Sequence, residues 1–441
     1  MRHAELPSSD RVTPLQILVA SLCFLTILID GFDTQSAAFA GPLLKREFGG
    51  GPQALGFIFG LGMFGALLGG MILGPLGDRF GRRPLLISAL CIMSAGSIAT
   101  GLADSAHEVA ILRLVTGLGL GGAVPNVIAL SAEYAPPRSR STVVSIVFNG
   151  FPLGAMLGSI VGAQLLPSYG WRTLFIVGGA IPVLVLVLVT LWLPESPAFL
   201  TRKSRRAATR RDLAQVGDSP TLLPSEPESS DARVSTLRLF SNGLGTSTAL
   251  IWAGTLLSIL CIYCTVNWLP VLISDGGLPL QTAILAVGVL NIGSVIGNLI
   301  LARFGDRSAA YVPTALFYVL GAIFLSLVGI SGSSSALMLG VTFGAGLFGF
   351  GGQLSVTTIT ARLYPTELRA TGTGWAFAMG RVGGVIGPVF AGSLLGYGMG
   401  FSTMMLILGG LMLLAGLAIF FLGRTRNARQ GRAAAFRIGA P

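Results

Sequence analysis

Residues 74–83 read GPLGDRFGRR, and they interrupt a part of the sequence that is otherwise strongly apolar. Apolar runs lie on both sides, near 54–76 and 84–103, and each is close to the length of about 20 residues that an α-helix needs to cross a bilayer. The aspartate and the three arginines of the segment are costly to place in hydrocarbon. They are therefore predicted to lie in water, between two membrane-spanning helices.

The whole chain has the composition of a protein embedded in lipid. Of its 441 residues, 52% are hydrophobic and only 11% are charged, against about 25% charged in an ordinary soluble domain. The 62 glycines allow helix backbones to approach one another closely, as they do in membrane proteins. The composition predicts an all-α polytopic membrane protein.

Ten further apolar runs of similar length follow the same pattern, with charged or turn-forming segments between them. The sequence therefore predicts twelve transmembrane helices. They lie near 15–39, 54–76, 84–103, 108–132, 142–166 and 171–193, and then near 246–273, 280–302, 311–330, 335–360, 370–396 and 400–423.

The basic residues indicate the orientation of these spans. Twelve spans place both termini on one side, and 24 of the 29 lysines and arginines fall on that side, in the tails and in the loops after even-numbered spans. Positive charge is retained in the cytoplasm. Both termini are therefore predicted to be cytoplasmic, and the net charge of +11 reflects topology, so no nucleic-acid partner is expected.

The chain is predicted to consist of two related halves. Gly77-Asp78-Arg79 recurs 228 residues later as GDR at 305–307, and YG at 169–170 recurs at 397–398 with the same offset. Such self-similarity marks a duplicated six-helix unit, as in transporters that rock two bundles around a central site. The predicted divisions are a tail (1–14), a six-helix bundle (15–193), a polar cytoplasmic linker (194–245), a second six-helix bundle (246–423) and a basic tail (424–441).

The segment at 74–83 resembles, at every defining position, the loop 2–3 signature of the major facilitator superfamily. DGFD at 30–33 resembles, more narrowly, the aromatic acid:proton symporters of that superfamily, as do GLGLGGAVPN (117–126), NWLP (267–270) and GRVGGVIGP (380–388). The resemblance implies the major facilitator fold. It also implies import of benzoate, hydroxybenzoates or hydroxyphenylpropionate-type acids into bacteria.

Charged residues inside the predicted spans are the candidates for coupling to protons, because an ionised side chain costs several kcal/mol at mid-bilayer. Asp30 and Asp33 are three residues apart, so they share a face of the first helix. Burial favours a neutral carboxyl and a nearby arginine favours an ionised one. The pair is therefore predicted to bind and release a proton, with Arg113, which the resemblance places beside the cavity, as counter-ion. Structural roles, or an Arg113 that extends to the outer interface, remain the alternatives.

Arg381 lies near the middle of the eleventh predicted span, among glycines. Its planar guanidinium suits bidentate binding of a carboxylate. It is predicted to bind the carboxylate of the substrate, with a structural ion pair as the alternative. Further contacts to an aromatic acid are expected from ring faces and from amides within the spans, namely Phe32, Trp268, Asn126, Asn267 and Gln353.

The segment at 74–83 is also predicted to form a gate at the cytoplasmic face, where contacts would hold the helix ends together and break on opening. Gly74 allows helices to touch, and Asp78 can pair with arginine or accept from a helix N-terminus. The second copy, GDRSAAYVP, lacks the trailing Gly-Arg-Arg, so the lock is expected mainly in the first half. Plain retention of positive charge is the alternative. The predicted gate comprises Gly74, Asp78, Arg79, Gly81, Arg82, Arg83, Glu133, Arg140, Glu367 and Arg369.

Together these features predict a monomeric, proton-coupled symporter of the bacterial inner membrane that imports an aromatic carboxylate by alternating access. A symporter of another organic anion, a drug exporter and a transporter-like chemoreceptor are the alternatives. The two histidines, His3 and His107, lie outside the predicted spans, and no cluster of metal-ligating residues is recognisable. Neither an enzyme, nor a cofactor, nor a bound metal is expected.

Overall fold

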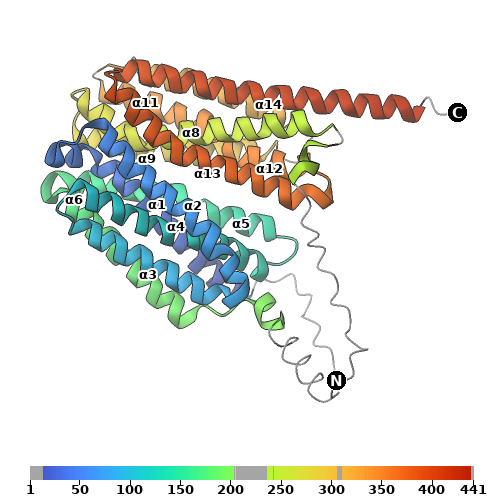
Figure 1. The fold of residues 1–441 in the computed structure, drawn as a ribbon, viewed down its shortest axis with the longest axis horizontal. Helices are drawn as coiled ribbons and strands as arrows, with labels where there is room; N and C mark the ends of the chain where they lie inside the picture. Colours follow the sequence, from blue (N-terminus) through green and yellow to red (C-terminus); the bar gives the residue numbers. More distant parts are fainter. Residues whose placement is uncertain are drawn as a thin grey trace.

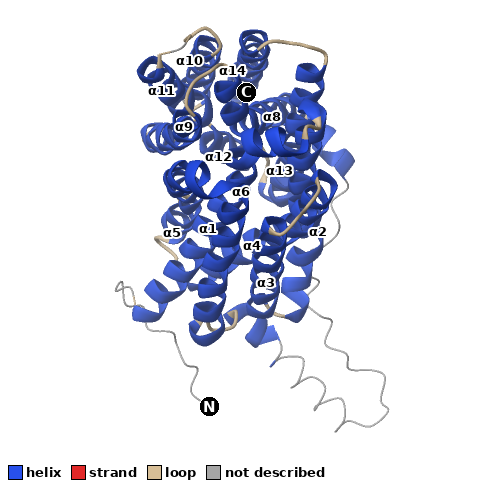
Figure 2. Ribbon diagram, turned by 90° about the vertical axis from the view of Figure 1, so that its left-hand side faces the viewer, coloured by secondary structure: helices blue, strands red, loops and turns tan. Residues whose placement is uncertain are grey.

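The computed structural model describes residues 13–202, 204, 236–241, 243–304, 310–332 and 334–438, and within them it is helical almost throughout, with no strand (Figures 1 and 2). Most of the predicted linker and the repeated GDR at 305–307 lie outside the described residues. The elements of the first half are α1 (Pro14–Phe48), α2 (Gly51–Phe80), α3 (Arg82–Gly101), α4 (Ala106–Tyr134), α5 (Arg140–Phe148) and α6 (Gly150–Trp192). Those that follow are η1 (Thr236–Phe240), α8 (Gly245–Asp275), α9 (Leu280–Ala302), α10 (Tyr311–Val328), α11 (Ser335–Gly344), η2 (Ala345–Phe350), α12 (Gln353–Leu363), α13 (Thr366–Gly396) and α14 (Phe401–Ile438).

Eleven helical segments of the described chain are long and apolar enough to cross a membrane. The longest, Arg140–Trp192, contains two predicted spans. Gly170 divides them, with φ 76° and ψ 176°, a conformation that residues with a side chain rarely adopt. Gly158 and Gly178 both lie against Phe32, so the chain doubles back between them. The predicted all-α membrane fold with twelve spans is confirmed.

Small residues let the helices of each half pack backbone to backbone. In the first half α1 packs on α6 and α2 on α4, and in the second half α8 packs on α13 and α10 on α14. A side chain at Gly31 would collide with the carbonyl group of Phe151, and one at Gly65 would collide with that of Leu114. The glycine between the two aspartates of α1 therefore serves a close helix contact.

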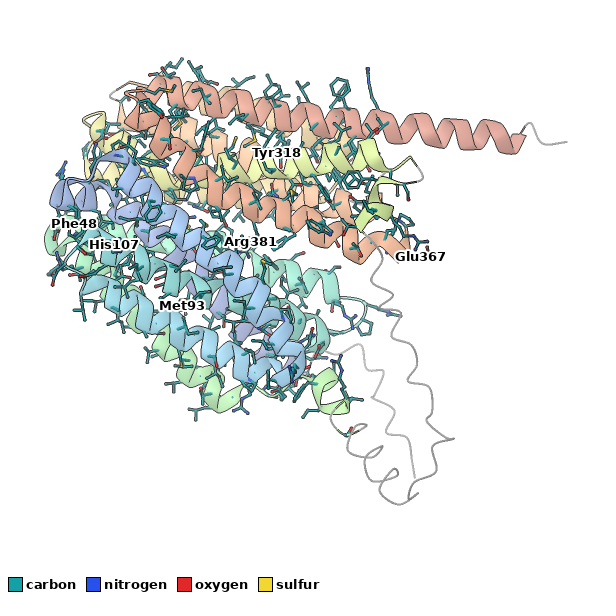
Figure 3. The ribbon with its side chains drawn as sticks, viewed as in Figure 1. Phe48, Met93, His107, Tyr318, Glu367 and Arg381 are labelled. Carbon is teal, nitrogen blue, oxygen red and sulfur yellow. The ribbon has the colours of Figure 1, made fainter. Side chains whose placement is uncertain are left out.

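The two halves meet along α2 with α13, α6 with α9 and α1 with α8. At the end of the molecule that bears Phe48, on the left in Figure 3, Lys45 Nζ lies 2.7 Å from Asp275 Oδ2 of the other half. Nearby, the rings of Phe59 and Trp268 meet edge to face with centroids 5.7 Å apart. These contacts join the halves at this end.

Candidate functional site: a cavity between the two halves

A cavity of about 480 Å³ lies between the halves and is lined by both of them. Its volume is within the range of about 300–1,000 Å³ that is usual for small-molecule sites. The lining extends along α5 to Val144 and along α12 to Thr360. The cavity therefore reaches toward the end of the molecule opposite to the Lys45–Asp275 contact, on the right in Figure 1.

Asp33 borders this cavity but is enclosed by protein partners. Its side chain is fully buried, with Oδ2 at 3.1 Å from Arg113 Nη1, and its Oδ1 accepts a hydrogen bond of 2.6 Å from the Ser97 hydroxyl. The other end of the guanidinium donates to the hydroxyls of Thr100 and Thr116, at 3.2 and 3.0 Å. The buried charge of Asp33 is thus compensated by a buried, hydrogen-bonded arginine. Arg113 does not extend to the outer interface.

Asp30, three residues earlier on the same helix, has a different environment. It is also buried and lines the cavity, but among the described residues the only hydrogen bond to its carboxyl comes from the Thr34 hydroxyl, which donates to Oδ1 at 3.2 Å. Within the described part of the chain, no basic group lies within 4 Å of its carboxyl. Arg381 of the second half acts electrostatically on this carboxyl and also on the phenol of Tyr263.

Arg381 lines the same cavity from α13 in the second half. Figure 3 shows it near the middle of the molecule, where the two halves face one another. Its guanidinium lies over the ring of Phe377, at 5.2 Å from the centroid, and forms no ion pair among the described residues. A guanidinium that borders a cavity without a carboxylate partner is able to bind an anionic ligand there.

Two of the amides predicted to contact substrate also line the cavity, Asn267 and Gln353. The Asn267 amide group donates to the backbone oxygen of Tyr263 at 2.7 Å, which leaves its carbonyl oxygen for the cavity. Gln353 Oε1 accepts from the hydroxyls of Ser258 and Tyr318, at 3.1 and 3.2 Å. Both side chains are thus held in one orientation by protein hydrogen bonds.

The structure places three other predicted contacts outside the cavity lining. Asn126 donates to the backbone oxygen of Gly122, on its own helix α4. Trp268 is fully buried and its indole N–H donates to Pro388 O at 3.0 Å. Phe32 packs against glycines of α6. The apolar or amide character of these side chains predicted that they would be buried in the protein. The sequence did not show which side of each helix faces the cavity.

Glu195, just after α6, holds the end of the segment at 74–83 in place through hydrogen bonds. Its Oε1 accepts from the backbone N–H groups of Arg82 and Arg83, at 2.9 and 3.2 Å, at the start of α3. A carboxylate is favoured at a helix N-terminus. Gly81 has φ 104°, and a side chain there would press on the Glu195 carboxylate. No role was predicted for Glu195; the signal was a helix that starts directly after glycine without a capping side chain.

Arg82 connects the same cluster to the neighbouring helices. Its guanidinium forms ion pairs with Asp78, at 3.2 Å, and with Glu133 of α4. The hydroxyl of Ser196 donates to Glu133 at 2.5 Å. These residues lie on α2, α3 and α4 and just after α6, so the cluster fastens those elements to one another and does not join the halves.

The other predicted gate residues lie around or apart from this cluster. Gly74 is close to the Pro125 ring, and the Arg83 guanidinium donates to the backbone oxygen of Thr190 at 2.5 Å. Arg79 lies over the ring of the adjacent Phe80. The last three are exposed, on α5 and at the start of α13, namely Arg140, Glu367 and Arg369.

Comparisons with known proteins agree with this architecture. The family model described as Major Facilitator Superfamily matches residues 23–388 and 303–440. The gallate transporter of Pseudomonas putida is 35% identical over 94% of this chain and 93% of its own length. The 3-(3-hydroxy-phenyl)propionate transporter of Escherichia coli is 34% identical over 94% and 96%. These relatives confirm the resemblance seen at residues 30–33 and 74–83.

Solved structures show the same fold. A bacterial homologue of the human lysosomal transporter Spinster, in an inward-facing and unoccupied conformation, superposes with a TM-score of 0.72. The two sequences are 17% identical, and the match covers 94% of this chain and 98% of the other. The likeness concerns the fold alone.

Proposed function

The chain belongs to the major facilitator superfamily, whose members are transporters and not enzymes, and on this premise we propose that it is a symporter that carries an aromatic carboxylate together with a proton. The relatives named for gallate and for hydroxyphenylpropionate support an aromatic acid as the cargo. Rings of Phe148, Phe151 and Phe350 line the cavity and give such a cargo an apolar surface.

One observation carries the proposal: Asp30 and Arg381 line one cavity from opposite halves, and neither forms an ion pair among the described residues. A carboxyl that exchanges a proton must be reachable from the cavity, and a guanidinium that binds a substrate carboxylate must be free to do so. Asp33 and Arg113 instead form an ion pair with each other. Asp30 is therefore the proton site in this mechanism, and Asp33 with Arg113 holds α1 against α4.

The charges of the site couple the two cargoes. While Asp30 is ionised, its negative charge competes with a substrate carboxylate for the field of Arg381. Once Asp30 has taken up a proton, that competition ends and Arg381 attracts the substrate more strongly. Proton and anion thus favour each other's binding, and the loaded cavity has no added net charge. When either the proton or the anion is released, the site binds the remaining one less tightly.

The arrangement of contacts between the halves supports a mechanism of alternating access. In the conformation described here, the Lys45–Asp275 pair and the Phe59–Trp268 contact close one end, and the cavity extends to the other. We assign the end toward which the cavity extends to the cytoplasm, because the basic segment 74–83 lies at that end. For substrate to enter from the outside, the Lys45–Asp275 pair and the Phe59–Trp268 contact must separate. The ends of α5 and α12 must then approach one another.

The test is uptake of radiolabelled benzoate, 4-hydroxybenzoate and gallate into vesicles that contain the purified protein. We expect uptake of at least one acid under an inward proton gradient, abolished by a protonophore and unaffected by a sodium ionophore. Arg381→Gln is expected to abolish uptake, whereas Arg172→Gln, at an exposed arginine paired with Glu47, is the matched control. Uptake of none of the acids, or uptake that does not respond to the protonophore, contradicts the proposal.

A further inference from the structure

Helices α8 and α13 lie backbone to backbone where they border the cavity. A side chain at Gly383 of α13 would be only 2.5 Å from the backbone oxygen of Leu256 on α8. Such close approach is usual where glycines line a helix interface within a membrane. Both helices contribute a polar side chain to the cavity lining near this interface, Tyr263 from α8 and Arg381 from α13.

The ring of Tyr263 packs on Gly384 of α13. A side chain at this glycine would lie 3.1 and 3.3 Å from two carbons of the ring. Carbon atoms in favourable contact are about 3.5–4.0 Å apart, so the ring occupies space that a glycine leaves open. Gly384 lies three residues after Arg381, on the same side of the helix. The charges of Arg381 and of Asp30 both act on the phenol, which is therefore close to the anion site and to the proton site.

The Tyr263 hydroxyl forms no hydrogen bond with any group in the described ranges of the chain. Only the backbone oxygen of this residue has a side-chain partner there, the amide of Asn267. Tyr318 differs, because its hydroxyl donates to Gln353 within the protein. The side chain of Tyr263 is half-buried and lines the cavity. A hydroxyl that borders a cavity without a protein partner is able to bind a molecule there.

We propose that Tyr263 is a second binding residue for the cargo, and that its hydroxyl donates a hydrogen bond to the carboxylate bound by Arg381. The inference rests on the proposed function, which places the carboxylate at this arginine. A carboxylate has about four acceptor positions, so a phenol and a guanidinium can donate to it together. Gly384 fixes the ring beside Arg381, and the guanidinium itself lies over the ring of Phe377. Two donors held in this way favour one orientation of the carboxylate.

Tyr263→Phe tests the hydroxyl, because it keeps the ring that packs on Gly384. The KM for the acid that wild-type vesicles take up is expected to rise about tenfold or more, since the lost hydrogen bond is one to a charged group. The maximal rate of uptake is expected to equal that of the wild type, which also reports that the variant has folded. Tyr397→Phe is the matched control with an unchanged KM, because it removes the hydroxyl of a tyrosine that is 85% exposed.

Gly384→Ala tests the position of the ring. The added methyl group presses on the ring of Tyr263 and displaces its hydroxyl, so KM is expected to rise. In the double variant with Tyr263→Phe no further rise is expected, since there is no hydroxyl left to displace. Gly380→Ala is the matched control with an unchanged KM, because its methyl group would be 3.3 Å from Ile259 and from Thr255 and would not touch the phenol.

The outcomes separate this inference from the proposed function. A wild-type KM in Tyr263→Phe, or effects of Tyr263→Phe and Gly384→Ala that simply add, overturns the role of Tyr263 and leaves the symporter intact. Failure of the wild-type protein to transport any aromatic acid overturns the proposed function and the role of Tyr263 with it.

Discussion

Asp30 and Asp33 have the same side chain, lie within one turn of α1 and are both buried. Among the described residues, however, Asp33 forms an ion pair and Asp30 does not. Asp33 meets α4 and α3, where Arg113 and Ser97 bind both of its oxygens. Asp30 meets the cavity, where one hydroxyl contacts it and Arg381 acts from the other half. The difference teaches that burial alone does not identify a coupling residue; the decisive feature is whether the protein has already compensated the charge.

Breaking the Asp33 pair is the change with the largest expected effect. Arg113→Ala leaves a buried carboxylate without its counter-ion, and loss of one partner of a buried pair costs about 3–5 kcal/mol. We expect little folded protein in the membrane and a markedly lower midpoint of thermal unfolding in detergent. Asp30→Ala, which removes no ion pair, is expected to leave both nearly unchanged.

The double variant Asp33→Leu/Arg113→Met separates charge from shape. Replacement of a whole buried pair by apolar residues is often neutral or stabilising, so the double variant is expected to recover most of the stability lost in Arg113→Ala. If Asp30→Ala proved as destabilising as Arg113→Ala, the contrast between the two aspartates would be wrong.

Asp30→Asn is expected to uncouple transport without affecting the fold. For one proton carried with one anion, each pH unit of gradient supports about tenfold accumulation, or about 1.4 kcal/mol. A gradient of two units should therefore concentrate substrate about 100-fold in vesicles with wild-type protein, and about onefold with Asp30→Asn. Exchange of labelled for unlabelled substrate should continue in the variant, because Arg381 is intact.

Asp33→Asn is the matched control for this measurement. It also removes one negative charge from α1, but in the proposed mechanism the transported proton binds Asp30 and not Asp33. Accumulation in its surviving folded fraction should still follow the gradient. Accumulation by Asp30→Asn that equals the wild type would remove Asp30 from the mechanism.

The fold was largely predictable from the sequence, because the length of an apolar run and the charges that end it are local properties. The division near Gly170 and the polar connection at 74–83 followed from such patterns. The extent of α14 did not: its span was expected to end at 423, but the helix continues to Ile438. Nothing in lipid-span length determines where a helix stops once it has left the membrane.

The site was predictable only in part. Asp30, Arg381, Asn267 and Gln353 do line the cavity, since charged and amide side chains in a span need a polar environment. The separate surroundings of Asp30 and Asp33 were not predicted, because two residues on one helical face still point about 60° apart, given 3.6 residues per turn. Which neighbour fills each direction depends on tertiary packing.

The same substitution at the two arginines should give two different results. A lysine cannot reproduce the forked donors of arginine. Arg381→Lys is expected to raise the KM for the aromatic acid about tenfold, since hydrogen bonds to charged groups contribute about 1.5–3 kcal/mol and part of the attraction remains. Arg113→Lys should lower thermal stability, because the bonds to Thr100 and Thr116 are lost. An unchanged KM in Arg381→Lys would contradict substrate binding at this residue.

The Lys45–Asp275 pair provides the exposed counterpart to the Asp33–Arg113 pair and the smallest expected effect. Its side chains are 33% and 49% exposed, and exposed ion pairs contribute only about 0–1 kcal/mol. A double-mutant cycle with Lys45→Ala and Asp275→Ala should therefore give a coupling energy below about 1 kcal/mol, and salt should reduce it further. In the proposed alternating-access mechanism this end opens in every transport cycle, and a weak contact suits such a closure. A coupling as large as that of the buried pair would mean that this end does not open readily, and that alternating access must break the halves apart elsewhere.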